Sequence, residues 1–241
     1  LQAIVTAAQG ILLGDADVAL AGGADCMSRA PYSTSAMRFG ARMGDTGMVD
    51  MMVGALTDPM HKVHMGVTAE NVRRTYAISR EAQDALALES HRRAAVAIEE
   101  GRFKEQLLPI TLKTRRGETV FDTDAHVRDN LTLEELSKLK PAFERNDGSV
   151  TAGNASSLND GAAAVVLMER ATAERRGLKP MARLVSYALA GVDPLHMGIG
   201  PVPATMLALE RAGLSVADLD VVEANEAFAA QACAVIRNSV S

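Results

Sequence analysis

Residues 219–228 constrain the fold most strongly, because they join a short apolar stretch to a helix through polar residues. The β-branched pair Val221 and Val222 predicts the centre of a strand, and the Ala-rich residues 227–236 predict a helix. A strand that ends at polar residues and leads into a helix is where open α/β sheets place their chemistry. Asn225 is therefore a candidate catalytic residue, because its carboxamide can donate a hydrogen bond or orient a water molecule. The alternative is that Asn225 only caps the helix.

The composition is that of a globular protein of one or two domains. The chain has 241 residues, of which 48% are hydrophobic and 23% charged. A net charge of −5 gives no reason to expect nucleic acid or an anionic membrane as a partner. No apolar run is long enough to span a bilayer, and Cys26 and Cys233 make no disulfide framework. These features predict a cytoplasmic protein, and no motif with metal-ligand spacing is present.

The pattern along the chain predicts an α/β fold. A helix over 1–13 is apolar nearly all round and is expected to be buried, as is a strand over 18–21. Between 28 and 157, helices and loops dominate, which suggests an insertion between two strands of one sheet. Further predicted elements are helices at 68–75, 79–100, 169–177 and 204–212, a hairpin within 107–120, and strands at 162–168 and 182–187.

Four stretches together resemble the thiolase family, whose members join or split acyl units on coenzyme A. They are His-Met-Gly-Val-Thr-Ala-Glu-Asn at 64–71, Thr-Ala-Gly-Asn-Ala-Ser at 151–156, Met-Gly-Ile-Gly-Pro at 197–201, and Asn-Glu-Ala-Phe-Ala-Ala-Gln at 225–231. They follow the family's order and approximate spacing, and the similarity runs over essentially the whole chain. The resemblance implies an incomplete, layered αβαβα thiolase-like fold with two similar halves and a large loop-domain insertion. It assigns 1–27 and 158–178 to the N-terminal half, 28–157 to a loop domain covering coenzyme A, and 179–241 to the C-terminal half.

The resemblance also implies site residues. It makes Asn225 catalytic, holding a water that stabilises a thioester oxyanion, and it overturns the capping alternative. It implies that the residues in contact with substrate or coenzyme A are His64, Met65, Arg128, Phe143, Ala152, Ser156, Met197, Ala227 and Phe228. A guanidinium can stack on adenine or pair with phosphate, so Arg128 suits the nucleotide end. The sequence departs from the family pattern at Ser157, where most relatives have Gly, and a side chain there narrows the slot for the pantetheine arm or lowers backbone freedom.

The ends of the sequence also bear on the resemblance. In thiolases the first helix follows a Cys-Gly-Ser-Gly segment that carries the nucleophile, and the last helix is followed by a Gly-His-Pro segment and a second reactive Cys. None of these lies within the 241 residues. The chain is therefore expected to be an internal fragment that has no thiolase activity alone, although coenzyme A should raise its melting temperature if its binding site is formed.

The implied reaction is acyl transfer: acetyl-CoA and a short-chain acyl-CoA give a 3-oxoacyl-CoA and coenzyme A, reversibly. A His at 64 favours the biosynthetic, acetoacetyl type. Coenzyme A thioesters are substrates and no separate cofactor is expected; the family suggests a homo-oligomer, a dimer or tetramer. One alternative is a β-ketoacyl synthase, against which the long insertion and Asn225 argue, because synthases usually have His there. The other is a non-catalytic, thiolase-like relative that binds acyl-CoA or lipid.

Overall fold

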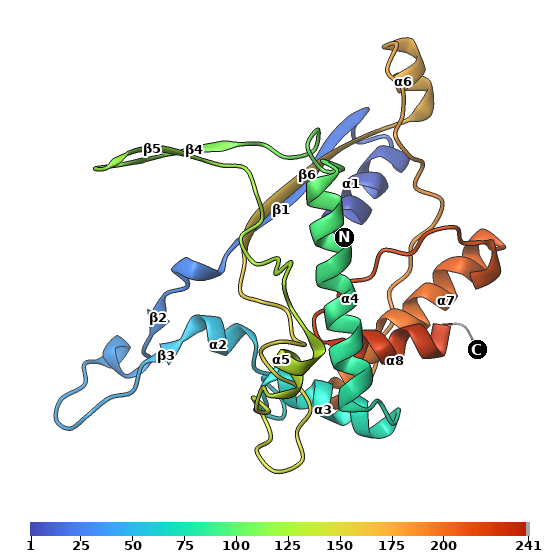
Figure 1. Ribbon diagram of the computed structural model, residues 1–241. Coiled ribbons are helices and arrows are strands. Elements are labelled where there is room, and N and C mark those ends of the chain that lie inside the picture. Colours follow the sequence, from blue (N-terminus) through green and yellow to red (C-terminus); the bar gives the residue numbers. More distant parts are fainter. Residues whose placement is uncertain (240–241) are drawn as a thin grey trace. The chain divides into compact units, whose positions relative to one another are not determined.

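The computed structural model describes residues 1–239 and divides the chain into two compact units (Figure 1). Unit 1 comprises Leu1–Met65, Leu158–Asp193 and Gly200–Val222. Unit 2 comprises Gly66–Ser157, Pro194–Ile199 and the described part of Glu223–Ser241. The three-part division predicted from the family resemblance uses other boundaries and stays a prediction.

Unit 1 is built around two long antiparallel strands, β1 (Val18–Cys26) and β6 (Asp160–Met168). Val18 lies opposite Met168 and Cys26 opposite Asp160, so the nine pairs run the full length of both strands. Helix α1 (Gln2–Leu12) packs against both strands. The side chain of Asp160 joins the ends of this sheet, because its carboxylate accepts hydrogen bonds from the Ser28 backbone N–H (2.9 Å) and hydroxyl (2.5 Å).

Burial in unit 1 is lower than the apolar sequence predicts. Of the described residues of β1, only Ala21 is buried, and Leu20 is 73% exposed. In α1 only Val5 and Ala8 are buried, whereas Leu12 is 80% exposed. The prediction of two-sided burial is wrong here because the sheet has only two strands. It covers one face of α1, and α1 is the one helix that packs on it within the described part of unit 1.

Two predicted strands are also absent. Residues 182–187 and 219–222 form no ladder, and Val221 is 79% exposed. A strand requires a hydrogen-bonded neighbour, and none of the described strands pairs with either segment. The remaining helices of unit 1 match the sequence better: α6 (Arg170–Arg175) lies within the predicted span, and α7 (Pro201–Ala212) begins three residues earlier than predicted. A short 3-10 turn, η4 (Val216–Asp218), follows α7.

The rest of unit 1 is an extended arm, defined here as residues 27–50, followed by helix α2 (Met51–Ala55). Along the arm lie η1 (Met27–Arg29), β2 (Tyr32–Ser33), η2 (Ala36–Phe39) and β3 (Val49–Asp50). Its two short strands pair antiparallel, with Tyr32 opposite Asp50. Within the loop between these strands, the hydroxyl oxygens of Thr34 and Thr46 lie 3.5 Å apart.

Unit 2 is mainly helical, with α3 (Met65–Thr75) leading into it, then α4 (Arg80–Glu99), α5 (Leu133–Ser137), η3 (Pro194–Ile199) and α8 (Ala229–Ser239). The prediction for α4 is confirmed, and the Ser79 hydroxyl caps it by accepting from the Ala82 N–H at 3.1 Å. Helix α4 packs against α5 and α8, and η3 packs against α8. The predicted hairpin is confirmed as β4 (Ile110–Thr114) and β5 (Gly117–Phe121), which project from this unit (Figure 1).

The core of unit 2 consists of two small apolar clusters on neighbouring turns of α3 and α8. Ala69, Val150 and Ala230 form the first, against which Phe143, Ala155 and Phe228 pack. Val72, Ile78 and Ala234 form the second, against which Tyr76, Ile199 and Cys233 pack. Residues 149–157 and 223–228, which carry two of the motifs, are therefore attached to the packed part of the unit.

Candidate functional site

The predicted site residues fall mainly in unit 2. That unit holds Arg128, Phe143, Ala152, Ser156, Met197, Asn225, Ala227 and Phe228, while His64 and Met65 end the first segment of unit 1. Their assignments to substrate and coenzyme A remain predictions, and the geometry below describes how the chain positions each of them.

Asn154 fixes the loop that carries Ala152 and Ser156. Its side-chain oxygen accepts from the Thr151 N–H at 2.8 Å, and its amide nitrogen donates to Asp84 Oδ1 at 2.8 Å and to the Ser149 carbonyl at 3.0 Å. Asn154 is 3% exposed, so these bonds form away from water. Ala152 and Ser156 flank this buried anchor and are themselves exposed.

Glu70 fixes the start of the same loop from helix α3. Its carboxylate accepts from the N–H groups of Ser149 (2.7 Å) and Val150 (2.8 Å) and pairs with Arg73 Nε at 3.1 Å. Glu70 is 0% exposed. A buried carboxylate is tolerated only when it is paired and hydrogen-bonded, as Glu70 is. Glu70 of the first motif and Asn154 of the second therefore stabilise the fold. A motif match alone does not distinguish such residues from residues that bind a ligand.

Residues 154–156 pair with residues 227–229. The Ser156 N–H donates to the Ala227 carbonyl at 2.9 Å, and the Ala229 N–H donates to the Asn154 carbonyl at 2.9 Å. Between these two bonds, Ala155 and Phe228 form an isolated antiparallel bridge. Two motifs that lie about seventy residues apart in sequence thus run side by side, and Ser156 lies next to the segment that carries Asn225.

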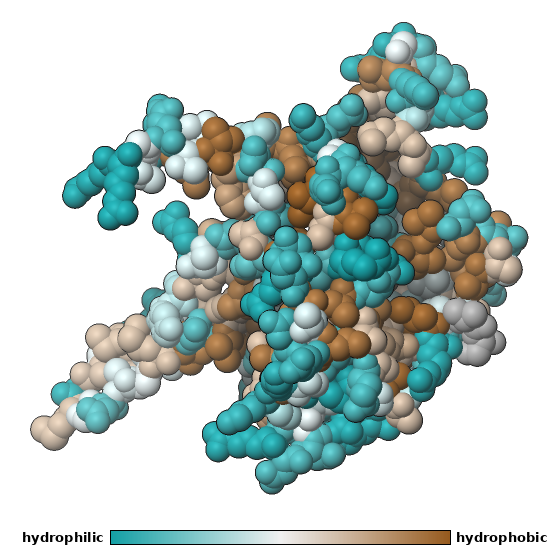
Figure 2. Space-filling view, viewed as in Figure 1, coloured by the Kyte–Doolittle hydropathy of each residue, from teal (hydrophilic) through white to brown (hydrophobic). Residues whose placement is uncertain are grey.

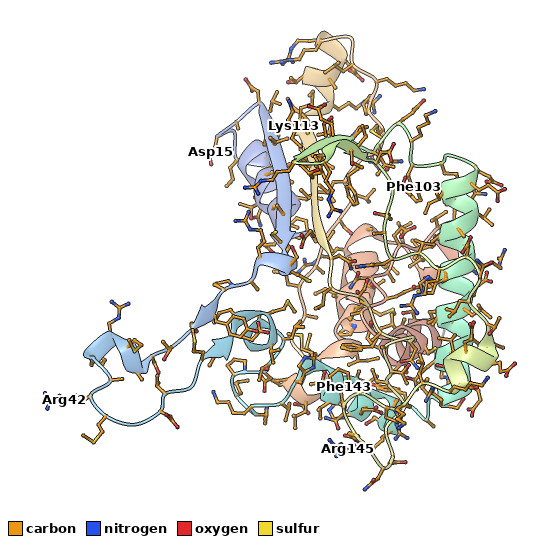
Figure 3. The ribbon with its side chains drawn as sticks, turned by 60° about the vertical axis from the view of Figure 1, so that its left-hand side comes forward. Asp15, Arg42, Phe103, Lys113, Phe143 and Arg145 are labelled. Carbon is orange, nitrogen blue, oxygen red and sulfur yellow. The ribbon has the colours of Figure 1, made fainter. Side chains whose placement is uncertain are left out.

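Phe143 and Phe228 form an aromatic pair with ring centroids 6.3 Å apart and an interplanar angle of 82°. This edge-to-face geometry is favourable for aromatic rings. A Cβ atom at Gly66 would overlap the Phe143 ring, so the Gly of the first motif makes room for this ring. In Figure 3 Phe143 lies against α3, whereas the exposed Arg145 extends from the loop that follows.

Met197 lies on η3, which is held against α3 and α8. Asn71 Nδ2 donates to the Leu195 carbonyl at 3.0 Å, and Thr75 Oγ1 lies 3.2 Å from His196 Nε2. A Cβ atom at Gly198 would lie 2.8 Å from Gln231 Cγ, so this glycine permits close packing on α8. Met197 itself is 43% exposed.

Asn225 is exposed and lies four residues before α8. The helix begins at Ala229, two residues later than predicted, so Asn225 is not its N-cap and the capping alternative fails. The neighbouring Glu226 is anchored to α4, because the Ser90 hydroxyl donates to Glu226 Oε2 at 2.6 Å. The side chain of Asn225 therefore stands on a segment held at Glu226, Ala227 and Phe228.

Arg128 is exposed, and its backbone N–H donates to His91 Nδ1 on α4 at 3.2 Å. Burial lowers the pKa of His91 below its ordinary value, the Arg128 charge lowers it further, and Glu226 opposes both. A neutral imidazole is what this bond requires, because Nδ1 can accept only when it carries no proton. Two residues before Arg128, His126 Nδ1 lies 2.8 Å from Ser157 Oγ.

His64 and Met65 follow a tight turn in unit 1. The Asp58 N–H donates to the Val63 carbonyl at 2.8 Å, His64 bridges to Thr57, and the Met65 N–H donates to the Leu56 carbonyl at 2.8 Å. Burial lowers the pKa of His64. The imidazole is therefore neutral near pH 7, which suits a hydrogen-bonding role better than an ion pair.

Cys233 does not have the surroundings of a nucleophile. Burial raises the pKa of Cys233, which keeps the thiol protonated, and the thiol donates to the Ala82 carbonyl at 3.8 Å. Cys26 is exposed at the end of β1. Within residues 1–239 no group of His, Cys, Asp and Glu could hold a metal ion, and no helix has the length and apolar character to cross a membrane.

Comparison with known proteins places the chain among thiolases. The thiolase N-terminal domain family matches residues 1–171, and the thiolase C-terminal domain family matches residues 178–240. The beta-ketothiolase BktB of Cupriavidus necator is 68% identical over 237 residues, which cover 98% of this chain and 60% of that protein. The acetyl-CoA acetyltransferase of Rhizobium meliloti is 52% identical over 236 residues, with the same coverage.

Solved structures agree with this result. The acetyl-CoA acetyltransferase of Bacillus anthracis superposes with a TM-score of 0.96 at 49% identity, covering 100% of this chain and 61% of that one. Human mitochondrial 3-ketoacyl-CoA thiolase in complex with CoA gives 0.93 at 42% identity, covering 100% and 60%. The chain spans about 60% of the length of the curated relatives it matches. Its thiolase-like α/β fold is thereby confirmed, and the chain belongs to the thiolase family.

Proposed function

We propose that this chain forms the coenzyme A-binding part of a thiolase that transfers acyl groups between coenzyme A thioesters. In the condensing direction, the α-carbon of acetyl-CoA loses a proton and bonds to the carbonyl carbon of a second acyl unit, yielding a 3-oxoacyl-CoA and free coenzyme A. The reverse reaction is thiolytic cleavage. Coenzyme A enters as substrate, and no separate cofactor is invoked.

The observation that best supports this proposal is the pairing of residues 154–156 with residues 227–229. It sets Ser156 beside the Asn225 segment, so a pantetheine arm on Ser156 would end near the Asn225 carboxamide. The names of the two relatives described above, beta-ketothiolase and acetyl-CoA acetyltransferase, describe this same chemistry in those proteins.

Each site residue has a role in the proposal. Arg128 contacts the nucleotide end of coenzyme A by charge or stacking, and Phe143 supplies an apolar wall beside the ligand. Ala152 and Ser156 line the pantetheine arm. The thioether side chain of Met197 lines a pocket suited to a short acyl group, with Ala227 and Phe228 completing it. His64 and Met65 keep the substrate-contacting role that the family resemblance implies.

Asn225 supplies electrostatic stabilisation. Its amide would hold a water that hydrogen-bonds the thioester oxygen as negative charge develops there, a contribution that matters more in the transition state than in the bound substrate. The nucleophilic Cys and the Gly-His-Pro His implied by the family are not among residues 1–241. The activity is therefore proposed for a protein in which these residues are joined to those segments.

The experiment is steady-state cleavage of acetoacetyl-CoA by such a protein carrying Asn225→Ala. We expect kcat to fall on the order of a hundredfold or more, as for loss of an oxyanion donor, with little change in coenzyme A affinity. Asn146→Ala, which alters an exposed Asn of the same unit, is the matched control. Equal activity of the two variants would remove Asn225 from the mechanism.

We also propose that the protein is a homo-oligomer, a dimer or tetramer. The support is the arm of unit 1, on which Phe39 is 92% exposed and Met43 is 99% exposed. Figure 2 shows white and light-brown residues along much of this arm, with teal hydrophilic residues between them. Exposed apolar side chains gathered on one projecting element mark a surface for protein association.

A further inference from the structure

We propose that Ser157 is a positioning residue of the coenzyme A site: with His126 it closes a ring of hydrogen bonds that orders three loops together before ligand binds. The loops are 126–128, 155–157 and 225–228. This inference rests on the proposed function, because that function is what makes these loops the binding loops. All members of the ring belong to unit 2.

Helix α4 supplies the fixed side of the ring through two adjacent residues. Ser90 donates its hydroxyl to Glu226 Oε2 at 2.6 Å, which holds the loop that carries Asn225. His91 accepts the Arg128 N–H at its Nδ1 atom, at 3.2 Å, which holds the loop proposed to bind the nucleotide. One turn of a long, well-capped helix thus anchors two loops that are far apart in sequence.

The other side of the ring runs through residues 156 and 157. The Ser156 N–H donates to the carbonyl of Ala227, the residue after Glu226, at 2.9 Å. The Ser157 hydroxyl lies 2.8 Å from Nδ1 of His126, two residues before Arg128. The path therefore leaves α4 at Ser90, passes through all three loops and returns to α4 at His91.

The bond between Ser157 and His126 decides whether the ring is closed. The bonds at Ser156 and Arg128 use backbone N–H groups that nearly any residue provides. The bond at residue 157 requires a side-chain hydroxyl, which Ser157 supplies. Glycine would remove the donor or acceptor and also add backbone freedom, so both effects open the ring.

A closed ring affects binding through entropy. A loop held at both ends has fewer conformations to lose when it closes on a ligand, so less of the interaction free energy is spent on ordering it. Ser157 does not need to touch coenzyme A for this effect. It acts by keeping Ser156 and Arg128 in place at the same time.

The test combines amide hydrogen exchange with coenzyme A titration on the purified protein. Without ligand, Ser157→Ala should speed exchange of the Arg128 and Ser156 amides severalfold, and Ser157→Thr, which keeps the hydroxyl, should not. Adding His126→Ala to Ser157→Ala should cause little further change, because the same bond is already lost. The coenzyme A Kd should rise about three- to tenfold in Ser157→Ala, the range expected for one hydrogen bond.

Three results would overturn the inference, and they are distinguishable. Unchanged exchange at the Arg128 and Ser156 amides in Ser157→Ala would show that the loops are not coupled through residue 157. Faster exchange with an unchanged Kd would show that the coupling exists without affecting binding, and would leave the proposed function intact. Failure of the unsubstituted protein to bind coenzyme A, with faster exchange in Ser157→Ala, would contradict the proposed function and the role of Ser157 in it, while leaving the ring itself in place.

Discussion

At the scale of single residues, His91 makes stability depend on pH. Burial and Arg128 lower the pKa of His91 in the folded protein below its ordinary 6.5, and burial does the same to His64. Below about pH 6.5 the unfolded chain therefore binds protons that the folded chain does not, so the free energy of unfolding falls as the pH drops through this range. Urea unfolding at several pH values between 7.5 and 5 should show this slope.

The variant His91→Gln separates the contribution of His91 from that of His64, because Gln can still accept a hydrogen bond but does not titrate. We expect a shallower fall in stability with decreasing pH in this variant. The same slope in both proteins would mean that His91 binds its proton equally well when folded.

The sequence could predict which residues lie at the site better than how each is held. Asn225 was proposed because it lies at the polar end of an apolar stretch. The sequence could not predict that its neighbour Glu226 is anchored to α4 while the Asn225 side chain is exposed. Glu70 stands in a motif, yet its two backbone hydrogen bonds go to residues 149 and 150, some eighty positions away. No local pattern reveals such partners, and the same holds for Ser157 and His126.

At the scale of elements, the carboxylate of Glu70 connects helix α3 to the loop that carries Ser156. Glu70→Ala leaves two buried N–H groups without an acceptor, so we expect the free energy of unfolding to fall by about 3 kcal/mol. Glu134→Ala is the control, because its side chain is 79% exposed and its ion pair with Lys138 is worth little. Equal losses in urea unfolding would show that Glu70 is not a structural anchor.

Elements that form through interactions between residues close in sequence were predicted more accurately than elements that need a partner far away in sequence. Helix α4 and the β4–β5 hairpin depend on a cap, a stop and a tight turn, all of which are local, and both elements were predicted. The strands expected at 182–187 and 219–222 depend on a neighbouring strand that their own residues do not specify. Residues 28–157 were predicted as helices and loops, but the sequence did not distinguish the arm from the packed helices of unit 2.

At the scale of the whole molecule, the arm is expected to hold copies of the chain together. Phe39→Ser removes a large apolar side chain that is 92% exposed, and we expect the dissociation constant of the oligomer to rise about tenfold or more. Met60→Ser changes a 66% exposed apolar residue outside the arm and should have little effect. Sedimentation measurements that give equal masses for both variants at all concentrations would contradict this role.

Family membership, the α/β fold and the identity of the site motifs could all be inferred before the structure, because four motifs in a fixed order are specific together. The grouping of most site residues in one unit could not, because that unit is assembled from three separate segments of the chain. The proposed function depends on this grouping of the site residues in unit 2.

The most direct measurement is amide hydrogen exchange, followed by mass spectrometry, on the protein with and without millimolar coenzyme A. We predict slower exchange with ligand in residues 126–128, 152–157 and 225–228, all in unit 2. Protection confined to other segments, or no protection at saturating ligand, would contradict the claim that these loops form a coenzyme A site.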